Sequence, residues 1–476
     1  MRRHVMKLNI LAVALGLAGC MNLAPHYQQP EAPVPAAWPS AASTGTTVPA
    51  LTGWREFFVD ERLREVVALA LLNNRDLRVS TLNVERAQAL YGITSAAALP
   101  SVNAGAGATR ARTPAGVTTN GQSRVADSYS ANLGVTAYEL DLFGRVRNLS
   151  DAALQTFFAS EETRRSAQIS LVSSVAAAWL QLATDQQRLQ LARNTLDSQR
   201  QSFELVRRAH ALGAQSGVAL AQAQTTVESA RVDVAAFDSV VEQDRNALAL
   251  LVGTTPPAEL LPGQAIEVIS LLPAPPAALP SSVLQQRPDV LAAEHALRAS
   301  NADIGAARAA FYPRIALTGS VGVASPSLSN LFEGGSRAWS FGPSITLPIF
   351  NGGATQANLR AVQAQREIQL ANYEKTLQTA FREVADALAT RRTLAERLDA
   401  QRALVAASTR SFDLAQALFK GGGGNYLSVL DAQRSLYAAQ QSLISLTLTE
   451  QGNRLTLYKV MGGGWSEQSQ AAQSPA

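Results

Sequence analysis

Apolar residues recur at every seventh position through two long stretches of this sequence. The first series comprises Val175, Leu182, Leu189, Leu196 and Phe203. The second series follows a glycine-containing break and comprises Leu220, Val227, Val234, Val241 and Leu248. A seven-residue repeat keeps one side of a helix facing a neighbour and predicts a left-handed supercoil. Two such helices joined by a short break therefore predict a long antiparallel helical hairpin.

The same hairpin pattern returns 209 positions later, with one polar departure in each of its two helices. Arg391 stands where the first series has Leu182, and Glu450 stands where the second series has Val241. Self-similarity at a fixed offset is typical of a repeated structural unit. The chain is therefore predicted to be an internal duplication.

Outside the helical stretches the period of the apolar pattern changes from seven to two. Alternating runs lie in two predicted β-hairpins, at about 101–141 and about 314–350. Runs of about ten residues with aromatic ends, such as Trp339 and Phe341, are typical of membrane β-barrel strands. A soluble sandwich with one wet face is the alternative. Pro343 lies inside the last run and predicts a local bulge.

These strands are the candidate membrane span. No stretch beyond the N-terminus reaches about 18 unbroken apolar residues, so no transmembrane helix is expected. Four strands cannot close a barrel, and open strand edges are not tolerated in lipid. The chain is therefore expected to oligomerise, although periodicity alone leaves two, three or four copies open.

The N-terminus has a basic start, an apolar core and then small residues, which predicts a secretory signal peptide over residues 1–19. The signal ends Leu-Ala-Gly before Cys20, which resembles a bacterial lipobox. Cleavage before Cys20 and acylation of this cysteine are expected, and an ordinary signal with a chance cysteine is the alternative. Met21 follows where inner-membrane lipoproteins carry aspartate, which favours the outer membrane.

The remaining boundaries follow from these patterns. The expected segments are a lipidated extended segment at 20–53, a first repeat at 54–253, a Pro-rich linker or equatorial belt at 254–282, a second repeat at 283–461 and a tail at 462–476. Long helical hairpins are expected at about 145–252 and about 352–460. The first repeat should open with a short helix that Asp60 caps and that ends near Asn73, then a second helix from about Asp76.

Composition argues against several classes of function. The formal net charge is +4, and losing Arg2, Arg3 and Lys7 with the signal lowers it to +1, so a nucleic-acid partner is not expected. The single cysteine excludes an internal disulfide, and the four histidines show no metal-ligand spacing. No constellation for an enzyme is visible. No cofactor is expected beyond the covalent lipid on Cys20.

Four short motifs stand in separate parts of the chain. They are Tyr138–Arg147 (YELDLFGRVR), Leu347–Gly353 (LPIFNGG), Leu430–Arg434 (LDAQR) and Tyr458–Trp465 (YKVMGGGW). Together with the lipobox and the duplication, they resemble the outer membrane factors, the TolC-like channels. The resemblance is greatest to the OprM-type branch of efflux lipoproteins, and it spans essentially the whole mature chain.

The resemblance implies a mixed α and β membrane protein. Its fold would be a TolC-like trimer with a twelve-stranded transmembrane β-barrel, four strands per chain, continued by a long antiparallel α-helical barrel. The function would be a passive exit duct for drugs or other small molecules in a tripartite efflux system. The partners would be a periplasmic adaptor and an inner-membrane pump of the resistance-nodulation-division type. The channel would be lipid-anchored in the outer membrane and extend into the periplasm.

The resemblance also assigns residues to the junctions and turns of the channel. The barrel-to-helix junctions would be formed by Leu140, Asp141, Phe143, Gly144, Pro348, Phe350 and Gly352. The helical turns that contact the adaptor would contain Gly213, Gly217, Gly422 and Gly423. Glycine needed only to reverse the chain is the simpler interpretation of these turns. Four consecutive glycines at 421–424 depart from the usual family pattern.

Leu427, Asp431 and Arg434 follow the second turn at spacings of four and three, which place them on one helix face. The family has its periplasmic gate at these positions. The first-half counterparts are Val218, Gln222 and Thr225, which are uncharged. Without the resemblance, an exposed Asp–Arg pair within the helix is the simpler interpretation. In a trimer the same residues would form rings in which the aspartates repel each other unless they are paired.

Four other interpretations are weighed against the efflux channel. A type I protein secretion channel would share the fold, but the lipobox and motifs favour efflux. A trimeric adhesin-type autotransporter would hold its strands together at the C-terminus. A periplasmic coiled-coil adaptor would lack the alternating strands. An enzyme would need a constellation that the sequence does not contain.

Overall fold

The structure is a computed structural model, and it describes residues 21–36, 38, 53–117, 119, 121–263 and 281–463. The chain forms two compact units. The first combines Met1–Glu31, Asn83–Glu161 and Ala292–Tyr373, and the second combines Ala32–Leu82, Glu162–Leu291 and Glu374–Ala476. Each unit contains segments from both halves of the duplication.

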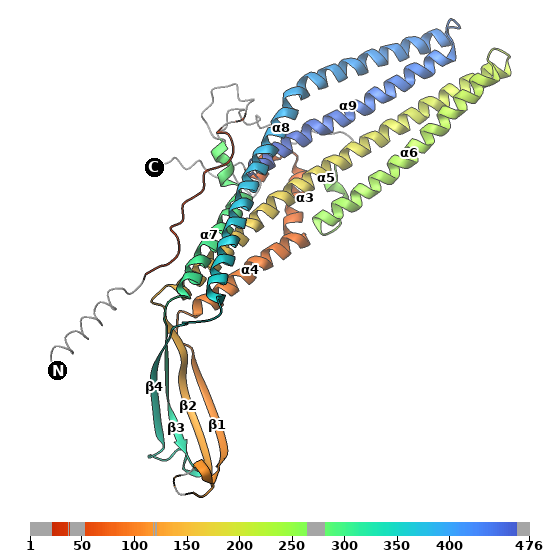
Figure 1. Ribbon diagram of the computed structural model, residues 1–476. Helices are drawn as coiled ribbons and strands as arrows, with labels where there is room; N and C mark the ends of the chain where they lie inside the picture. The colour runs from red at the N-terminus through yellow and green to blue at the C-terminus, as the bar shows by residue number, and fades with distance from the viewer. Residues whose placement is uncertain are drawn as a thin grey trace. The chain divides into compact units, whose positions relative to one another are not determined.

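One antiparallel sheet dominates the first unit (Figure 1). Its strands, in the order β1-β2-β3-β4, are β1 (Val102–Thr113), β2 (Arg124–Leu140), β3 (Arg314–Ser325) and β4 (Arg337–Thr346). The β2–β3 pairing joins the two halves of the chain. Short 3-10 turns lie in the two strand connections, at Ala115–Val117 and Leu328–Asn330.

The apolar side chains of the sheet lie on the surface of the single chain. Val102, Leu133, Val321 and Trp339 are 54–79% exposed. Among the described residues there is no second sheet, so the soluble sandwich that the alternation left open is not the fold observed.

The bulge predicted at Pro343 is wrong. Pro343 lies in register opposite Leu317, while the irregularity falls in β2 between Val135 and Tyr138. Ala137 in this bulge has φ 53°, in the left-handed region. Pro343 has no N–H to donate, yet the register of β3 and β4 continues through it without a shift.

The N-terminal segment of the first unit lies extended against α7 (Pro288–Ala309). Asn301 Nδ2 donates to the carbonyl of Pro25 at 2.8 Å, and Arg308 Nη1 donates to the carbonyl of Leu23 at 3.1 Å. Gly305 permits this approach, because a Cβ there would lie 2.8 Å from Ala24 Cβ. Residues 21–31 therefore have no core of their own and pack on that of the unit.

Four long helices carry the predicted heptad seams. They are α5 (Arg145–Ala211), α6 (Gly217–Val252), α8 (Ala354–Lys420) and α9 (Tyr426–Val460). In the second unit the seam residues face inward, since Leu182 and Leu248 are fully buried and Val384 is 2% exposed. The two polar departures differ, because Arg391 is exposed while Glu450 accepts from Arg454 Nη2 at 2.8 Å.

Shorter elements complete the second unit around a buried aromatic core. They are α2 (Trp54–Phe57), α3 (Glu61–Asn73), the start of α4 (Arg75–Ala96), and 3-10 turns at Ala258–Leu260 and Ser281–Gln286. Asp60 caps α3 as predicted, accepting from the backbone N–H groups of Arg62 and Leu63. The ring of Phe57 stacks on that of Tyr458 with centroids 3.8 Å apart. Most of the predicted linker, residues 264–280, lies outside the described residues.

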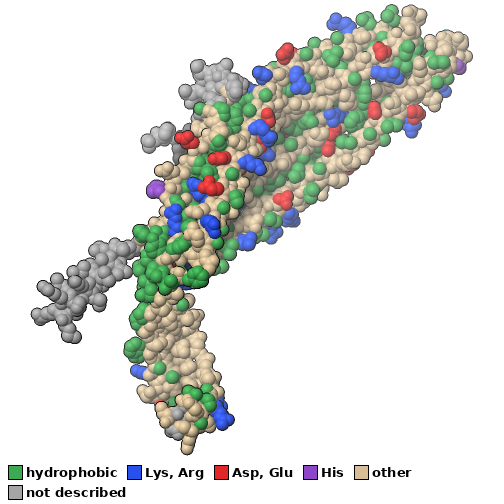
Figure 2. Space-filling model, viewed as in Figure 1, with side chains coloured by type: hydrophobic (Ala, Val, Ile, Leu, Met, Phe, Trp, Pro, Cys, Tyr) green, Lys and Arg blue, Asp and Glu red, His purple; other side chains and the backbone are tan. Residues whose placement is uncertain are grey.

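One described helix, α5, is long and apolar enough to cross a membrane by length and composition alone. However, 61% of its most apolar window is buried within the chain, and a helix in the core of a protein would meet the same criteria of length and composition. On the face drawn in Figure 2, acidic and basic side chains are interspersed along the helices.

Candidate functional site

The two helical turns have matching geometry. Gly213 follows α5 with φ 76°, and Gly422 follows α8 with φ 79°, so both occupy the left-handed region that ends helices. Ser216 then caps α6 by accepting from Ala219 N at 3.2 Å, and Asn425 caps α9 by accepting from Ser428 N at 2.9 Å. A Cβ built on Gly213 or Gly422 would have no atom within 4 Å, so a partner can reach the backbone there.

The other two predicted turn glycines have ordinary backbone angles and more local roles. Gly217 is the first residue of α6, and a Cβ there would lie 3.8 Å from His210 Nε2. Gly423 donates its backbone N–H to the carbonyl of Leu418 at 2.9 Å, which closes the end of α8. In the run of four glycines, Gly422 alone requires a positive φ.

Leu427, Asp431 and Arg434 lie together on one exposed face at the start of α9. Leu427 is 57% exposed. No ion pair within the described chain joins Asp431 to Arg434.

The same spacing does form ion pairs on the neighbouring helices. Arg200 pairs with Asp197 at 3.5 Å, and Arg402 pairs with Asp399 at 3.3 Å. The simple pair within the helix, which the sequence left open for Asp431 and Arg434, is therefore not what the structure contains. The first-half counterparts Val218, Gln222 and Thr225 include one exposed apolar side chain, Val218 at 67%.

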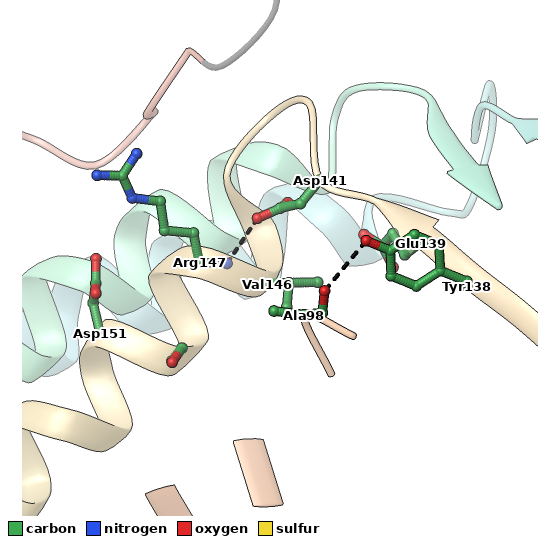
Figure 3. A pocket seen from close by; sticks show the side chains of 8 residues that line it. Ala98, Tyr138, Glu139, Asp141, Val146, Arg147 and Asp151 are labelled. Atoms are coloured by element: carbon green, nitrogen blue, oxygen red, sulfur yellow. Dashed lines mark hydrogen bonds between the residues drawn. The ribbon is translucent and has the colours of Figure 1, made fainter. Parts of the chain in front are cut away.

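The first barrel-to-helix junction follows β2 directly. Leu140 ends the strand, and Asp141 Oδ2 accepts from the backbone N–H of Arg147 at 2.7 Å, which caps the first turn of α5 (Figure 3). Gly144 takes φ 72° in the turn. The ring of Phe143 stacks on that of Tyr312 with centroids 4.7 Å apart.

A charged cluster that the sequence did not predict braces this junction. The side chain of Glu139 is 9% exposed and accepts two hydrogen bonds from Arg145, both at 2.8 Å. Arg314 Nε lies 2.6 Å from the same carboxylate. Glu139 is the penultimate residue of β2, Arg145 is the first of α5 and Arg314 is the first of β3, so the cluster connects three elements. The sequence feature that could have revealed this cluster is Glu139, a charged residue within a strand of alternating apolar residues.

A cleft of about 220 Å³ lies beside this cluster. Its walls include Tyr138, Asp141, Arg147 and Asp151, and Tyr138 Oη donates to the carbonyl of Ala98 at 3.2 Å (Figure 3). Its acids and bases are engaged in hydrogen bonds or lie apart, and their arrangement provides no nucleophile–base pair. The cleft belongs to the architecture of the junction.

The second junction is more exposed than the first. Phe350 is 91% exposed, and Gly352 has φ 63° just before α8. Pro348 lies in the same turn, between β4 and α8. Cys20, the predicted lipidation site, lies outside the described residues. Within the described ranges, no group of three His, Cys, Asp or Glu side chains could hold a metal ion.

Comparison with known proteins agrees with this architecture. The model of the "Outer membrane efflux protein" family matches residues 66–254 and 279–463. Two relatives are the toluene efflux pump outer membrane protein TtgC of Pseudomonas putida, 45% identical over 100% of this chain and 99% of its own, and the outer membrane protein OprJ of Pseudomonas aeruginosa, 44% identical over 98% of each. The chain belongs to the outer membrane efflux protein family.

Solved structures show the same fold. The open state of the MtrE outer membrane channel of Neisseria gonorrhoeae superposes with a TM-score of 0.86 at 38% identity, over 95% of this chain and 100% of that one. A membrane protein from Pseudomonas aeruginosa superposes with a TM-score of 0.88 at 44% identity, over 94% and 98%.

The chain is thus a TolC-like channel protein of the outer membrane that extends into the periplasm. It serves as the outer-membrane channel of a tripartite efflux system, with a periplasmic adaptor and an inner-membrane pump. These relatives do not favour the protein-secretion alternative.

Proposed function

We propose that this channel is closed at rest by rings of Leu427, Asp431 and Arg434 from three copies of the chain. The observation that carries the proposal is that Asp431 and Arg434 share one exposed face without pairing, although equally spaced residues pair nearby. Charges that do not pair within their own helix are available to a neighbouring copy.

The electrostatics of such rings favour closure. Three like carboxylates around a narrow axis repel each other, and the repulsion strengthens as water is displaced. Pairing each Asp431 with Arg434 of the next copy turns this repulsion into attraction, and Leu427 adds an apolar constriction beside it. Opening then requires these links to break, which adaptor binding at the turns around Gly213, Gly217, Gly422 and Gly423 would promote.

The sheet supports the same trimeric arrangement. Edge strands β1 and β4 each leave one row of backbone groups without a partner strand in the described chain. Such rows are not tolerated in lipid, so β4 of one copy must pair with β1 of the next. Three copies would close a barrel of twelve strands. The junction residues around Gly144 and Gly352 would then connect the barrel to the helices.

Lipidation and the segment boundaries belong to the same proposal. Residues 1–19 would be removed as a signal, and the acylated Cys20 would anchor the extended segment 20–53 beside the barrel. The carbonyl of Met21 lies 3.5 Å from where a Cβ at Gly144 would be, so the described N-terminal segment begins beside the first junction. Residues 254–282 would form part of the belt between the repeats at 54–253 and 283–461.

The relatives suggest the substrates. Their printed names include a toluene efflux pump and an antibiotic efflux pump from Pseudomonas putida. We therefore propose that this duct passes small, largely apolar organic molecules, including antibiotics. The channel would catalyse no reaction and need no cofactor, since the pump supplies the energy.

The test is the single-channel conductance of purified protein in planar lipid bilayers. Asp431→Ala with Arg434→Ala should raise the mean conductance several-fold. Asp399→Ala with Arg402→Ala is the matched control, since it removes an exposed pair of equal spacing on α8, and it should leave conductance unchanged. Unchanged conductance in a well-folded Asp431/Arg434 double variant would refute the gate.

A further inference from the structure

Tyr426 is the first residue of α9, between the capping residue Asn425 and the exposed Leu427. It is only 3% exposed. It belongs to a buried cluster with Val206 of α5 and Ala223 of α6, both fully buried. The side chain therefore reaches from the turn of the second hairpin into the buried cluster that includes α5 and α6 of the first. Its counterpart 209 positions earlier is Gly217, which has no side chain to make the reciprocal contact.

The start of α9 presents two different faces. Tyr426, Val429 and Leu430 lie at helical spacing and are each 2–3% exposed in this cluster. Leu427 and the two charged gate residues lie on another face, in solvent. The position of the gate face therefore depends on how firmly the buried face is held. A tyrosine buries about 150–250 Å² and is the largest side chain available to hold it.

The hydroxyl group opposes this attachment. Tyr426 Oη is buried and makes no hydrogen bond of normal geometry within the described chain. The side chain of Thr226 lies beside it, but the single proton of Thr226 Oγ1 is directed to Gln199 Oε1 and the Ala223 carbonyl, each at 2.8 Å, so Thr226 donates none to Tyr426. A buried hydroxyl that has given up water without gaining a partner destabilises the state that buries it.

The rest of the cluster gives the ring strong apolar contacts. Phe419, the penultimate residue of α8, lies with its ring centroid 5.4 Å from that of Tyr426, tilted by 49°. Phe203 and Phe412 pack at the edge of the same cluster. Tyr426 thus combines a ring that fastens α9 with a hydroxyl that regains hydrogen bonds when α9 moves away.

We propose that Tyr426 is a releasable latch, a positioning residue that holds the start of α9 on α5 and α6 and so sets where the gate residues stand. The ring stabilises the resting position of α9 on α5 and α6. The unpaired hydroxyl destabilises that position enough for α9 to move away from it. This inference rests on the proposed gate and deepens it, because it names what holds the gate-bearing helix within one copy.

A latch role for Tyr426 predicts an effect on gating that a role in packing alone does not predict. Tyr426→Phe keeps the ring and removes the unpaired hydroxyl, so it should shift the channel toward closure. Relief of an unpaired buried hydroxyl corresponds to at least about a fivefold change in the ratio of closed to open channels. Tyr426→Ala removes the ring and should raise the open fraction.

The experiment compares Tyr426→Phe in wild-type protein and in the Asp431→Ala, Arg434→Ala background, by single-channel recording in planar bilayers. Tyr437→Phe on the same helix is the control, because Tyr437 Oη has a partner, Asp233 Oδ2 at 3.3 Å. Tyr437→Phe should not favour closure. Because Tyr426→Phe preserves the packing, the test does not depend on whether Tyr426→Ala folds.

A fall in open fraction for Tyr426→Phe, absent for Tyr437→Phe, supports the latch. No change, or a rise, overturns it, while the gate still stands if the Asp431/Arg434 double variant alone raises conductance. If that double variant has no effect but Tyr426→Phe still lowers the frequency of residual wild-type openings, the latch stands and the proposed gate residues are wrong.

Discussion

Asp244 on α6 lies against the buried carboxyl group of Asp185 on α5. Asp185 is 2% exposed, and it accepts hydrogen bonds from Arg188 Nη1 at 2.8 Å and from Gln181 Nε2 at 2.6 Å. Arg188 also donates to Ser445 Oγ on α9 at 2.8 Å. Burial, and then the hydrogen bond and like charge of Asp185, raise the pKa of Asp244 to about 6.

The raised pKa sets the direction of the pH dependence. The folded chain keeps the Asp244 proton up to about pH 6, whereas the unfolded chain loses it near its ordinary pKa of 3.8. Between these values the folded state binds more protons, so the free energy of unfolding falls as the pH rises. Above about pH 6 the loss is complete. The carboxyl pair therefore destabilises the hairpin at neutral pH.

Asp244→Asn should remove this penalty, because an amide cannot ionise and can still donate to Asp185. The full pKa difference would correspond to roughly 3 kcal/mol at 1.36 kcal/mol per unit. Asp244 is partly open to water, which screens the interaction, so we expect a gain of about 1 to 1.5 kcal/mol at pH 7.5. At pH 4 the gain should be nearly absent.

The assay is guanidinium unfolding of the detergent-solubilised protein, followed by helix circular dichroism at pH 4 and pH 7.5. Asp238→Asn is the matched control on the same helix, since Asp238 is 62% exposed in its side chain and pairs with Arg193 at 3.2 Å. The control should change stability by less than about 0.5 kcal/mol at either pH. Equal effects of Asp244→Asn at both pH values, or a loss at pH 7.5, would refute the reasoning.

Two further predictions use the same unfolding assay. Gly253 caps α6 with φ 80°, and a Cβ there would lie 2.4 Å from the Asn73 carbonyl oxygen, so Gly253→Ala should cost about 2 kcal/mol or more; a smaller cost would show that α3 can move aside. Arg391→Leu with Glu450→Val gives the second hairpin the seam residues of the first, Leu182 and Val241, but Arg391 is exposed and Glu450 pairs with Arg454 at 2.8 Å, so this double variant should cost up to about 1 kcal/mol. A net gain in this double variant would mean that the two charges weaken the seam where they stand.

The fold was predictable from the sequence wherever the signal is periodic and local. The heptad series predicts long helices, and α5 and α6 are long helices, because every turn of a helix repeats the same constraint. The alternating runs likewise predict the four strands. The bulge was misplaced because it depends on how β2 meets β3, which lies in the other half of the chain. Proline identity at position 343 carries no information about that register.

The candidate site was predictable only in part, because its key contacts join distant positions. The spacing of Leu427, Asp431 and Arg434 predicts one face, and the structure has them on one face. The bracing of Glu139 by Arg314 joins residues 175 positions apart, and no local pattern connects them. The burial of Tyr426 against Val206 is equally remote from any periodic signal.

The two halves of the chain have similar backbones at their helical turns but different side chains on them. Gly213 and Gly422 have nearly the same positive φ, because each glycine follows the end of a long helix. Side chains are free to diverge on that shared backbone, and they do so where the second hairpin has Tyr426 in place of Gly217 and Glu450 in place of Val241. The first hairpin is apolar throughout its two heptad series, while the second has Arg391, which is exposed, and Glu450 at two of these positions and is held near its turn by Tyr426. Apolar seams separate less readily than interrupted ones, so any movement that opens this channel should take place in α8 and α9 while α5 and α6 remain in place.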